Sequence, residues 1–347
     1  MVDRVIKNWL EYIDFEQLKV KIKGRKVYIW GVWKYSAPVA EACRENGIDN
    51  CSIVEGENEY IGSNGIRVEK SDKVHESEDA FVIITVINSL SEIQTKLAER
   101  GFLADKDYIA IHKHYVIEYY GGYYEDLCGN IINSDDYRET PVKIELKGYN
   151  NHIRIGRNVE FKKCEVACWY GAALTFASRS EFVETYIWAS EEGQISIGEG
   201  CVFAKGCEVL ARGKMEIGNG FTIEKDGVIS ADYESPIKIG NDCMCSISVH
   251  IWSNNSHALM DLEAKENTGL SKKHYVSIGN HVWLGDKTTV LYNAEIEDNS
   301  IVGACSLVNK SFPANCVIAG NPAKVLKENY SWDRRPRMTY EEFISGQ

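Results

Sequence analysis

The sequence predicts an α/β domain followed by a long all-β solenoid, and two changes in apolar spacing along the chain carry this prediction. Residues 26–112 alternate short apolar runs with stretches of helical periodicity, which is typical of a parallel sheet with crossover helices. From about residue 142 a branched or small apolar residue instead returns every six positions. The predicted organisation is an α/β domain over 1–120, a linker over 121–141, a solenoid over 142–330 and a tail over 331–347.

Apolar runs predict four strands in the first region. They are "KVYIW" (26–30), "CSIV" (51–54), "AFVIITV" (80–86) and "YIAIH" (108–112). Helical spacing follows the first strand in "GVWKYSAPVAEACRENG", which Gly47 ends, and follows the third strand in "SLSEIQTKLAERG". This alternation resembles a small Rossmann-type domain.

The first turn between strand and helix decides whether such a domain holds a nucleotide. It reads "GVWKYS" (31–36) and resembles the "GAGKYG" turn of many sugar-modifying enzymes. Gly31 is kept, but Trp33 and Ser36 stand where glycines would let the backbone approach a pyrophosphate. Glu55, at the end of the second strand, could hold a ribose hydroxyl. A docking or structural role is favoured over a sugar-nucleotide or dinucleotide site, and all three readings stay open.

The second region repeats one inward position. Its members are Ile155, Phe161, Ala167, Ile197, Phe203, Val209, Ile217, Ile223, Ile229, Ile239, Cys245, Ile251, Ile278, Leu284, Val290, Ile296, Val302 and Val308. Glycine follows this position at 156, 198, 218, 240, 279, 285 and 303. Six residues per side suit a triangular coil of three short strands, with the repeating residue inside and glycine helping to turn the corner.

Charge and composition argue against several classes of protein. A formal net charge of −12 without a block of basic residues argues against nucleic-acid binding. The longest apolar run, "FVIITVI" at 81–87, is too short to span a membrane, and the charged start of the chain lacks the apolar core of a signal peptide. We therefore expect a cytoplasmic protein without membrane insertion. Its eleven cysteines are expected to stay reduced and to pack as small apolar residues.

The end of the solenoid carries a more specific signal. Residues 276–327 read "VSIGNHVWLGDKTTVLYNAEIEDNSIVGACSLVNKSFPANCVIAGNPAKVLK". The six-residue period with "VWLG", "VGACSLV", "FPAN" and "AGNPAKV" resembles the hexapeptide-repeat acyltransferases, notably the galactoside, maltose and xenobiotic branch and the capsule or O-antigen O-acetyltransferases. The resemblance implies a left-handed parallel β-helix with a short C-terminal helix. It also implies a homotrimer with acetyl-CoA, the co-substrate, in a groove between subunits.

In this family, backbone groups of the coils pair with pantetheine, and basic side chains near the C-terminus meet the CoA phosphates. Carried over by motif, the implied acetyl-CoA contacts are Asp286, Ala304, Asn309, Lys310, Lys324 and Lys327. The last two lie in "NPAKVLK", where the family often has arginine. Lysine keeps the positive charge there but not the bidentate contact. No metal is expected.

The six-residue count fails over residues 252–275, where "SNNSHALMD" ends at Asp261. This segment resembles "SDGHxIxD", in which the polysaccharide branch presents a catalytic histidine on a loop. His257 and Asp261 match, whereas Asn255 replaces an aspartate that would orient the imidazole. A sugar hydroxyl attacks a thioester poorly until its proton is removed, and neutral imidazole suits that task near neutral pH. The resemblance implies that His257 is the general base of direct acetyl transfer to a sugar hydroxyl in bacterial surface polysaccharide.

Other polar side chains are candidate contacts for the acceptor. They are Asp232 in "ISADYESP", Asn255 and Asp261 in the loop, and His281 in "GNHVWLG". His250 precedes an inward position and is expected to be structural, as is Trp283 at a coil corner. His274, near the return of the loop, is expected to be exposed.

Three alternatives stay open beside sugar O-acetylation. The nearest is N-acetylation of an amino-sugar nucleotide, since some sugar N-acetyltransferases place a Rossmann-like domain before the β-helix. A zinc enzyme resembling the γ-class carbonic anhydrases would use His250, His257 and His281 as ligands, although their spacing lacks the expected close pair. A trimeric scaffold without catalysis is the third alternative, against which the intact "VGACSLV" and "NPAKVLK" count.

Overall fold

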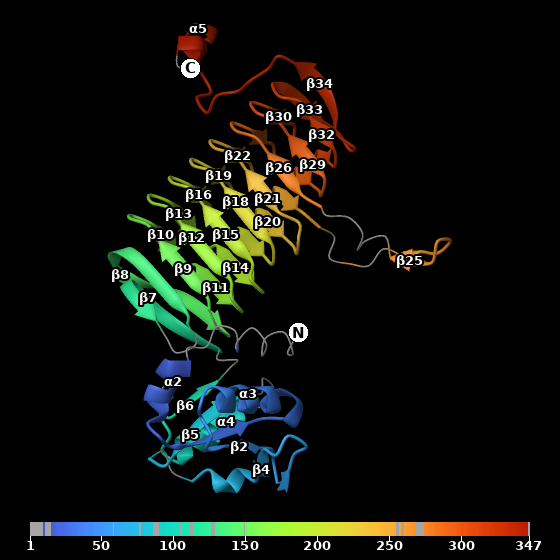
Figure 1. The fold of residues 1–347 in the computed structure, drawn as a ribbon. Helices are drawn as coiled ribbons and strands as arrows, with labels where there is room; N and C mark the ends of the chain where they lie inside the picture. The colour runs from blue at the N-terminus through green and yellow to red at the C-terminus, as the bar shows by residue number, and fades with distance from the viewer. Residues whose placement is uncertain are drawn as a thin grey trace.

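The structure is a computed structural model. It describes residues 10, 15–57, 59–75, 78–85, 90–104, 106–110, 114–125, 129–148, 150–254, 257, 260–267 and 274–345. Figure 1 shows the α/β domain at the N-terminal end of a column of stacked coils, with the C-terminal segment at the far end. Among the helices of the described residues, none is long and apolar enough to cross a membrane.

The α/β domain contains the predicted parallel sheet. Its strands are β1 (Lys26–Trp30), β2 (Cys51–Val54), β3 (Tyr60–Ile61), β4 (Arg67–Glu69), β5 (Ala80–Ile84) and β6 (Tyr108–Ala110), in the order β3-β4-β2-β1-β5-β6. Its helices are α2 (Phe15–Ile22), α3 (Trp33–Glu45), α4 (Leu90–Glu99) and the 3₁₀ turn η1 (Ser71–Lys73). The central strands are apolar throughout because helices and loops cover both faces of the sheet, so that alternate residues of β1 enter two separate core clusters.

Two antiparallel pairings were not predicted. β3 pairs antiparallel with β4 at the sheet edge. β7 (His114–Glu125) and β8 (Ile131–Lys147) form a long antiparallel hairpin, so residues 121–141, expected to be a linker, largely belong to strands. β8 also pairs in parallel with the first coil, which covers the open end of the solenoid.

The solenoid has three faces, and each coil contributes one strand to each face. The first face contains β9 (His152–Ile155), β12 (Ala173–Phe176), β15 (Gln194–Ile197), β18 (Lys214–Ile217), β21 (Ile237–Ile239), β26 (Val276–Ile278), β29 (Ala294–Ile296) and β32 (Ser311–Phe312). The second face contains β10 (Glu160–Lys162), β13 (Glu181–Val183), β16 (Val202–Phe203), β19 (Thr222–Ile223), β22 (Met244–Cys245), β27 (Trp283–Leu284), β30 (Ile301–Val302) and β33 (Cys316–Ala319). The third face contains β11 (Glu165–Trp169), β14 (Tyr186–Ser190), β17 (Glu208–Ala211), β20 (Val228–Ala231), β23 (His250–Trp252), β28 (Thr289–Val290) and β31 (Leu307–Val308).

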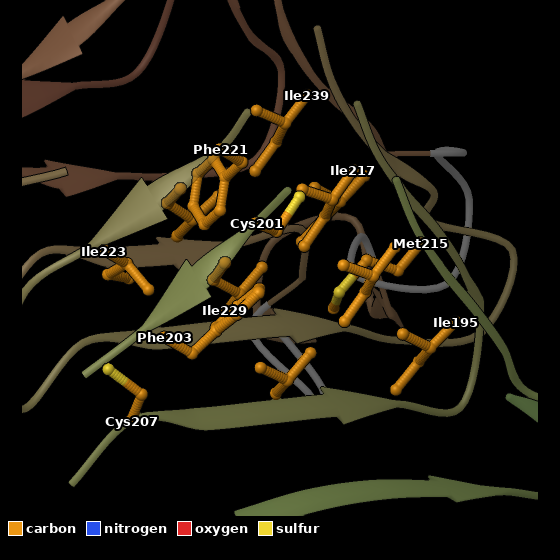
Figure 2. Close-up of a cluster of buried hydrophobic side chains, with 14 of the residues drawn as sticks. Ile195, Cys201, Phe203, Cys207, Met215, Ile217, Phe221, Ile223, Ile229 and Ile239 are labelled. Carbon is orange, nitrogen blue, oxygen red and sulfur yellow. The ribbon is translucent and has the colours of Figure 1, made fainter. Parts of the chain in front are cut away.

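The predicted inward residues form the core of these coils, with one exception. Ala167 pairs with the outward Trp188, and its neighbours Val166 and Cys168 point inward instead, because the six-residue count slips by one in the first coil. Each strand pairs in parallel with its equivalent in the next coil, as in the register Ile197↔Ile217 and Ile217↔Ile239. Phe182 and Phe203 stack with ring centroids 4.9 Å apart, and Figure 2 shows Phe203 near Phe221 and Ile223 within the apolar interior. Burial of such side chains is the main stabilising contribution, at about 25 cal/mol per Å² of apolar surface. The parallel β-helix is therefore confirmed.

The first corner of each coil is held by a ladder of polar side chains. Backbone N–H groups donate to side-chain oxygens of the next coil at Glu199→Asn219, Asn219→Asn241, Asn241→Asn280 and Asn280→Asp298, over 2.6 to 2.9 Å. Glycine precedes these positions because the coils approach closely: a Cβ on Gly218 would lie 2.6 Å from the carbonyl carbon of Gly240.

The cysteines pack as expected. Ten cysteines fall within the described residues, all of them free thiols, and nine of these are buried. Cys201, Cys207 and Cys245 point into the coils, as the repeat predicts, and burial raises the pKa of the Cys207 thiol to about 11. Cys305 is the exposed one among those described, because it lies at a corner beside the stack.

The two domains meet at the first coil. Trp169 and Tyr170, at the end of β11, pack against the core of the α/β domain, and Tyr170 is only 8% exposed. The Lys147 ammonium lies 4.9 Å from the Trp169 ring centroid and 5.7 Å from that of Tyr170. An aromatic and cationic contact therefore joins the α/β domain to the solenoid.

The chain turns back at the far end of the solenoid. β34 (Lys324–Glu328) pairs antiparallel with β33 and closes the second face. Residues 329–335 then run back along the coils, and the short helix α5 (Tyr340–Ser345) follows. The predicted C-terminal helix is confirmed, although "NPAKVLK" ends in a strand.

Candidate functional site

Each coil turns at three corners, which we number by the face that precedes them. The third corner leads from the third face to the next coil. Between β23 and β26 this corner is replaced by the long loop of residues 253–275, within which β24 (Met260–Asp261) and β25 (Glu266–Asn267) pair antiparallel. Figure 1 shows β25 well outside the column of coils. The break in the six-residue count is therefore a loop that leaves the solenoid.

The candidate base lies in this loop. His257 has an exposed side chain, and Asn255 lies outside the described residues. The Asp261 carboxylate accepts the backbone N–H groups of Glu263 and Ala264, both at 2.9 Å. Asp261 thus shapes the turn between β24 and β25, a local use that its match to the family motif did not indicate.

The start of the loop is held by an ion pair with a buried carboxylate. Asp232, 6% exposed, lies at the third corner of the preceding coil, where its Oδ1 is 3.1 Å from Arg212 Nε. Its Oδ1 also accepts the backbone N–H of Tyr233 at 2.9 Å, and its own N–H donates to Ser253 Oγ at 3.1 Å. Ser253 is fully buried and is the first residue beyond β23. These contacts fix the chain where the loop begins.

The return of the loop is anchored as well. His274 is 7% exposed, so the expectation of an exposed side chain is wrong. Its ring packs on Tyr292 with centroids 4.4 Å apart, and its Nδ1 lies 3.4 Å from Asn293 Oδ1. The sequence pattern missed this burial because His274 falls within the interruption, where the six-residue count gives no inward position.

His281 lies at the first corner, away from the loop. Its ring nitrogens are 2.7 Å from Asp242 Oδ2 and 2.8 Å from the Trp332 carbonyl oxygen. Both partners, the Asp242 carboxylate and the Trp332 carbonyl, are hydrogen-bond acceptors. Arg334 also donates to Asp242, at 2.9 Å. The His281 side chain thus holds the C-terminal segment against the coils.

The candidate acetyl-CoA contacts fall into two groups at the C-terminal end. Asp286 and Ala304 lie at the second corner of successive coils, where the Asp286 carbonyl accepts the N–H of Cys305 at 2.7 Å. Lys324 and Lys327 lie on β34 at the edge of the adjoining second face. The side chains of all four residues are exposed.

Asn309 and Lys310 lie apart from that group, at the third corner that follows β31. Both are exposed, and the Lys310 ammonium is 5.3 Å from the Phe312 ring centroid. The two groups therefore border the third face of the last coils from its two sides. This is the face that also leads to the interrupted corner.

The three histidines of the zinc alternative are not brought to one corner. His250 lies in β23 on the third face and His257 in the loop, whereas His281 lies at the first corner. Among the described residues, no group of three or more histidine, cysteine, aspartate or glutamate side chains could hold a metal ion.

Comparison with known proteins points to one family. Residues 275–310 match the sequence family described as bacterial transferase hexapeptide (six repeats). The polysialic acid O-acetyltransferase of Neisseria meningitidis is 32% identical over 216 residues, which cover 61% of this chain and 90% of that protein. The chain belongs to the hexapeptide transferase family. It is accordingly an acyltransferase.

Further relatives of this transferase match shorter parts. The polysialic acid O-acetyltransferase of Escherichia coli O1:K1 is 28% identical over 133 residues, and the chain spans 40% of its length. The solved structure of the polysialic acid O-acetyltransferase OatWY is 26% identical, with a TM-score of 0.44 over 58% of this chain and 97% of that one.

The α/β domain of this transferase has a filled first turn. The Trp33 indole occupies the space over Gly62, where an added Cβ would lie 1.9 Å from the ring. Ser36 Oγ, in the first turn of α3, lies 2.7 Å from Thr85 Oγ1, just beyond β5, and both residues are buried. The Glu55 carboxylate accepts the hydroxyl of Tyr60 at 3.0 Å. Trp33 and Ser36, which stand in place of the glycines of the "GAGKYG" turn, thus pack against other residues of the α/β domain.

Sequence reasoning did not identify Arg212, Trp332 or Arg334. One signal was available for Arg212, because it lies 20 residues before Asp232, the length of one coil. Residues one coil apart stack on each other, so opposite charges at this spacing predict an ion pair. No such spacing links the tail residues to the corner that they contact.

Proposed function

We propose that this hexapeptide transferase is an acetyl-CoA-dependent O-acetyltransferase that modifies a sugar hydroxyl of bacterial surface polysaccharide. The observation that carries the proposal is the replacement of one coil corner by a loop with an exposed histidine, at the motif position of the catalytic histidine. Relatives named as polysialic acid O-acetyltransferases support the chemistry, one of them over nine-tenths of its length.

His257 acts as the general base. Its neutral imidazole removes the proton of the acceptor hydroxyl while the hydroxyl oxygen attacks the thioester carbon, which forms the new C–O bond. The resulting imidazolium returns that proton to the thiolate sulfur as the C–S bond breaks. The imidazole ends neutral, and no acyl-enzyme is needed. A backbone N–H near the thioester carbonyl stabilises the oxyanion.

The chain offers groups that fit acetyl-CoA. Lys324 and Lys327 present positive charge for the phosphates on an exposed strand, in a chain whose net charge is −12. Asp286 and Ala304 belong to the corner beside them, where backbone groups are available for the pantetheine amides. Asn309 and Lys310 border the other side of the same face.

We propose a homotrimer in which this face of one subunit meets the next. Outward side chains on the third face include Trp188, Leu210 and Leu291, all half-buried in the single chain. An apolar face of this kind is covered by self-association, and closed cyclic symmetry is the usual outcome. The acetyl-CoA groove then lies between two copies, with the loop of His257 above it.

The activity is tested with purified full-length protein, acetyl-CoA and a panel of acceptors, by following the release of free thiol. The panel contains oligosialic acid, galactosides and an amino-sugar nucleotide. Alkali-labile acetyl groups on a sugar hydroxyl are the expected product. An alkali-stable amide on the amino-sugar nucleotide would replace this function by N-acetylation, and the absence of thiol release with every acceptor would contradict it.

A further inference from the structure

Exposed aromatic rings gather where the loop of His257 leaves and rejoins the solenoid. Among the phenylalanine, tyrosine and tryptophan side chains described between residues 150 and 310, three are exposed: Tyr233 (37%), Trp252 (44%) and Tyr275 (40%). Trp252 ends β23, Tyr275 precedes β26, and Tyr233 lies at the same corner of the preceding coil. The other aromatic rings of this part of the chain are buried or half-buried, so the cluster is specific to this corner.

A charged pair with fixed geometry lies in the same place. The Asp232 carboxylate, less than a tenth exposed, accepts from Arg212 and from the backbone N–H of Tyr233. The Asp232 backbone N–H donates to Ser253 Oγ. The Arg212 guanidinium also lies over the Tyr233 ring, with its Cζ 5.1 Å from the centroid. Its side chain remains 36% exposed. The ion pair therefore orients the ring of Tyr233 and presents one edge of Arg212 to solvent.

We propose that Tyr233 and Trp252, together with Arg212, form an acceptor subsite that binds a pyranose ring. This inference rests on the proposed function, because it names the contacts of the acceptor in that transfer. A pyranose has faces of C–H groups that pack on an indole or phenol ring, whereas its hydroxyl groups need polar partners at the rim. The aromatic rings supply the first kind of contact, and the Arg212–Asp232 pair supplies the second.

The position of the cluster agrees with this use. Arg212, Asp232 and Trp252 belong to three consecutive coils, and adjacent strands lie about 4.8 Å apart. The cluster thus extends about 10 Å along the column, which suits one or two sugar rings. It is continuous in sequence with the loop that carries His257, since only four residues separate Trp252 from that histidine. A sugar ring bound there would lie at the start of the loop that carries the base.

A second copy of the chain is the competing occupant. The middle of a protein–protein interface is depleted in charged residues. Here the Arg212–Asp232 ion pair lies beside the Tyr233 ring, and its arginine keeps more than a third of its side chain exposed. This favours a sugar, whose hydroxyl groups can pair with both charges, over an apolar protein surface.

The test measures binding without turnover. The full-length His257→Ala variant is titrated calorimetrically with a sialic acid trimer and, separately, with lactose, and the titrations are repeated after adding Trp252→Ala or Tyr233→Ala. We expect the Kd of at least one sugar to rise by about tenfold in each double variant, the usual effect of removing one well-packed aromatic contact. Trp252→Phe should recover part of the affinity. Val202→Ala, which truncates a 38% exposed side chain on the second face, is the matched control and should not change Kd.

Equal affinity with and without Trp252 would overturn the subsite, as would binding of neither sugar. A smaller assembly of Trp252→Ala in sedimentation velocity would also overturn it, because the rings would then belong to a contact between copies. These outcomes are separate from failure of the proposed function. If the single His257→Ala variant kept full transferase activity, the base would be wrong while the titrations still decided the subsite.

Discussion

The ring of His281 stacks on the indole of Trp332, with centroids 4.3 Å apart and planes within 9° of parallel. The Trp332 indole N–H donates to the His281 carbonyl at 2.8 Å, and a nitrogen of the His281 ring lies 2.8 Å from the Trp332 carbonyl. Two residues 51 positions apart are thus joined by a ring contact and two hydrogen bonds. This contact fastens the C-terminal segment to the first corner of an earlier coil.

Trp332→Ala should release that segment without unfolding the coils. The indole is 6% exposed, so its loss removes the ring stack and a part-buried hydrogen bond, worth about 3 kcal/mol locally. Limited proteolysis should then cut residues 329–345 faster, while the thermal midpoint of the solenoid changes by only a few degrees. Tyr340→Ala, which truncates a 73% exposed side chain of the same segment, is the control. Equal cutting rates in both variants would contradict the role of Trp332.

His257→Ala should lower the turnover of acetyl transfer by at least about a hundredfold, the scale of a lost general base. The KM for acetyl-CoA should stay within about twofold of its original value, because this histidine is not expected to contact the nucleotide. His152→Ala removes an exposed histidine of the first coil and should leave turnover unchanged. Steady-state thiol release measures both variants. Near-normal turnover of His257→Ala would remove this residue from the mechanism.

Replacing Lys324 and Lys327 by alanine should raise the KM for acetyl-CoA by about tenfold and leave turnover nearly unchanged, because each lysine stabilises bound phosphate in both the ground and transition states. The difference between variant and parent should shrink as ionic strength rises, since salt screens exposed charges. Lys238→Ala, an exposed lysine on the first face, is the control for the loss of a positive charge. An unchanged KM in the double variant would exclude β34 from the site.

Glu69 should make the stability of the α/β domain depend on acid pH. Burial alone would raise the pKa of its carboxyl group, but hydrogen bonds from Lys26 at 2.7 Å and Ser52 at 2.8 Å lower it overall. The stabilisation is therefore complete above the pKa of the unfolded chain and is lost as pH falls through the folded value. The free energy of unfolding is measured with urea at pH 7 and at pH 4. At pH 7 Glu69→Gln should be less stable than the parent, and at pH 4 the difference in free energy between the two should be smaller. A stability difference that is larger at pH 4 than at pH 7 would contradict the lowered pKa of Glu69.

The regular part of this fold follows from the sequence because its periodicity has one physical cause. Each inward residue, such as Ile217 or Ile229, must be apolar to enter the coil, and each strand finds its partner one coil away. A local pattern thus sets the register of distant parts of the chain. The same reasoning explains the α/β strands, which are apolar on both faces because both faces are covered.

The parts that were missed lack such a pattern. The β7–β8 hairpin mixes tyrosines, charges and glycines, and its partly solvated strands show no continuous apolar run. The burial of His274 and the contact of Trp332 with His281 depend on segments that meet only after the coils have stacked. Similarly, the sequence predicts Asp232 only as a candidate acceptor contact, and its ion pair with Arg212 is seen only in the structure.

Cys305 should be the most reactive thiol among the described cysteines, and its modification should interfere with acetyl-CoA. Its side chain is exposed at the second corner, next to Ala304, and its N–H donates to the Asp286 carbonyl. Burial raises the pKa of other thiols, to about 11 for Cys243, which leaves little thiolate there at neutral pH.

Peptide mapping after brief treatment with iodoacetamide should find Cys305 labelled first, with acetyl-CoA slowing the reaction. The labelled protein should show a raised KM for acetyl-CoA, and Cys305→Ser should resist this effect. Labelling at an unchanged rate with saturating acetyl-CoA would place the co-substrate away from this corner.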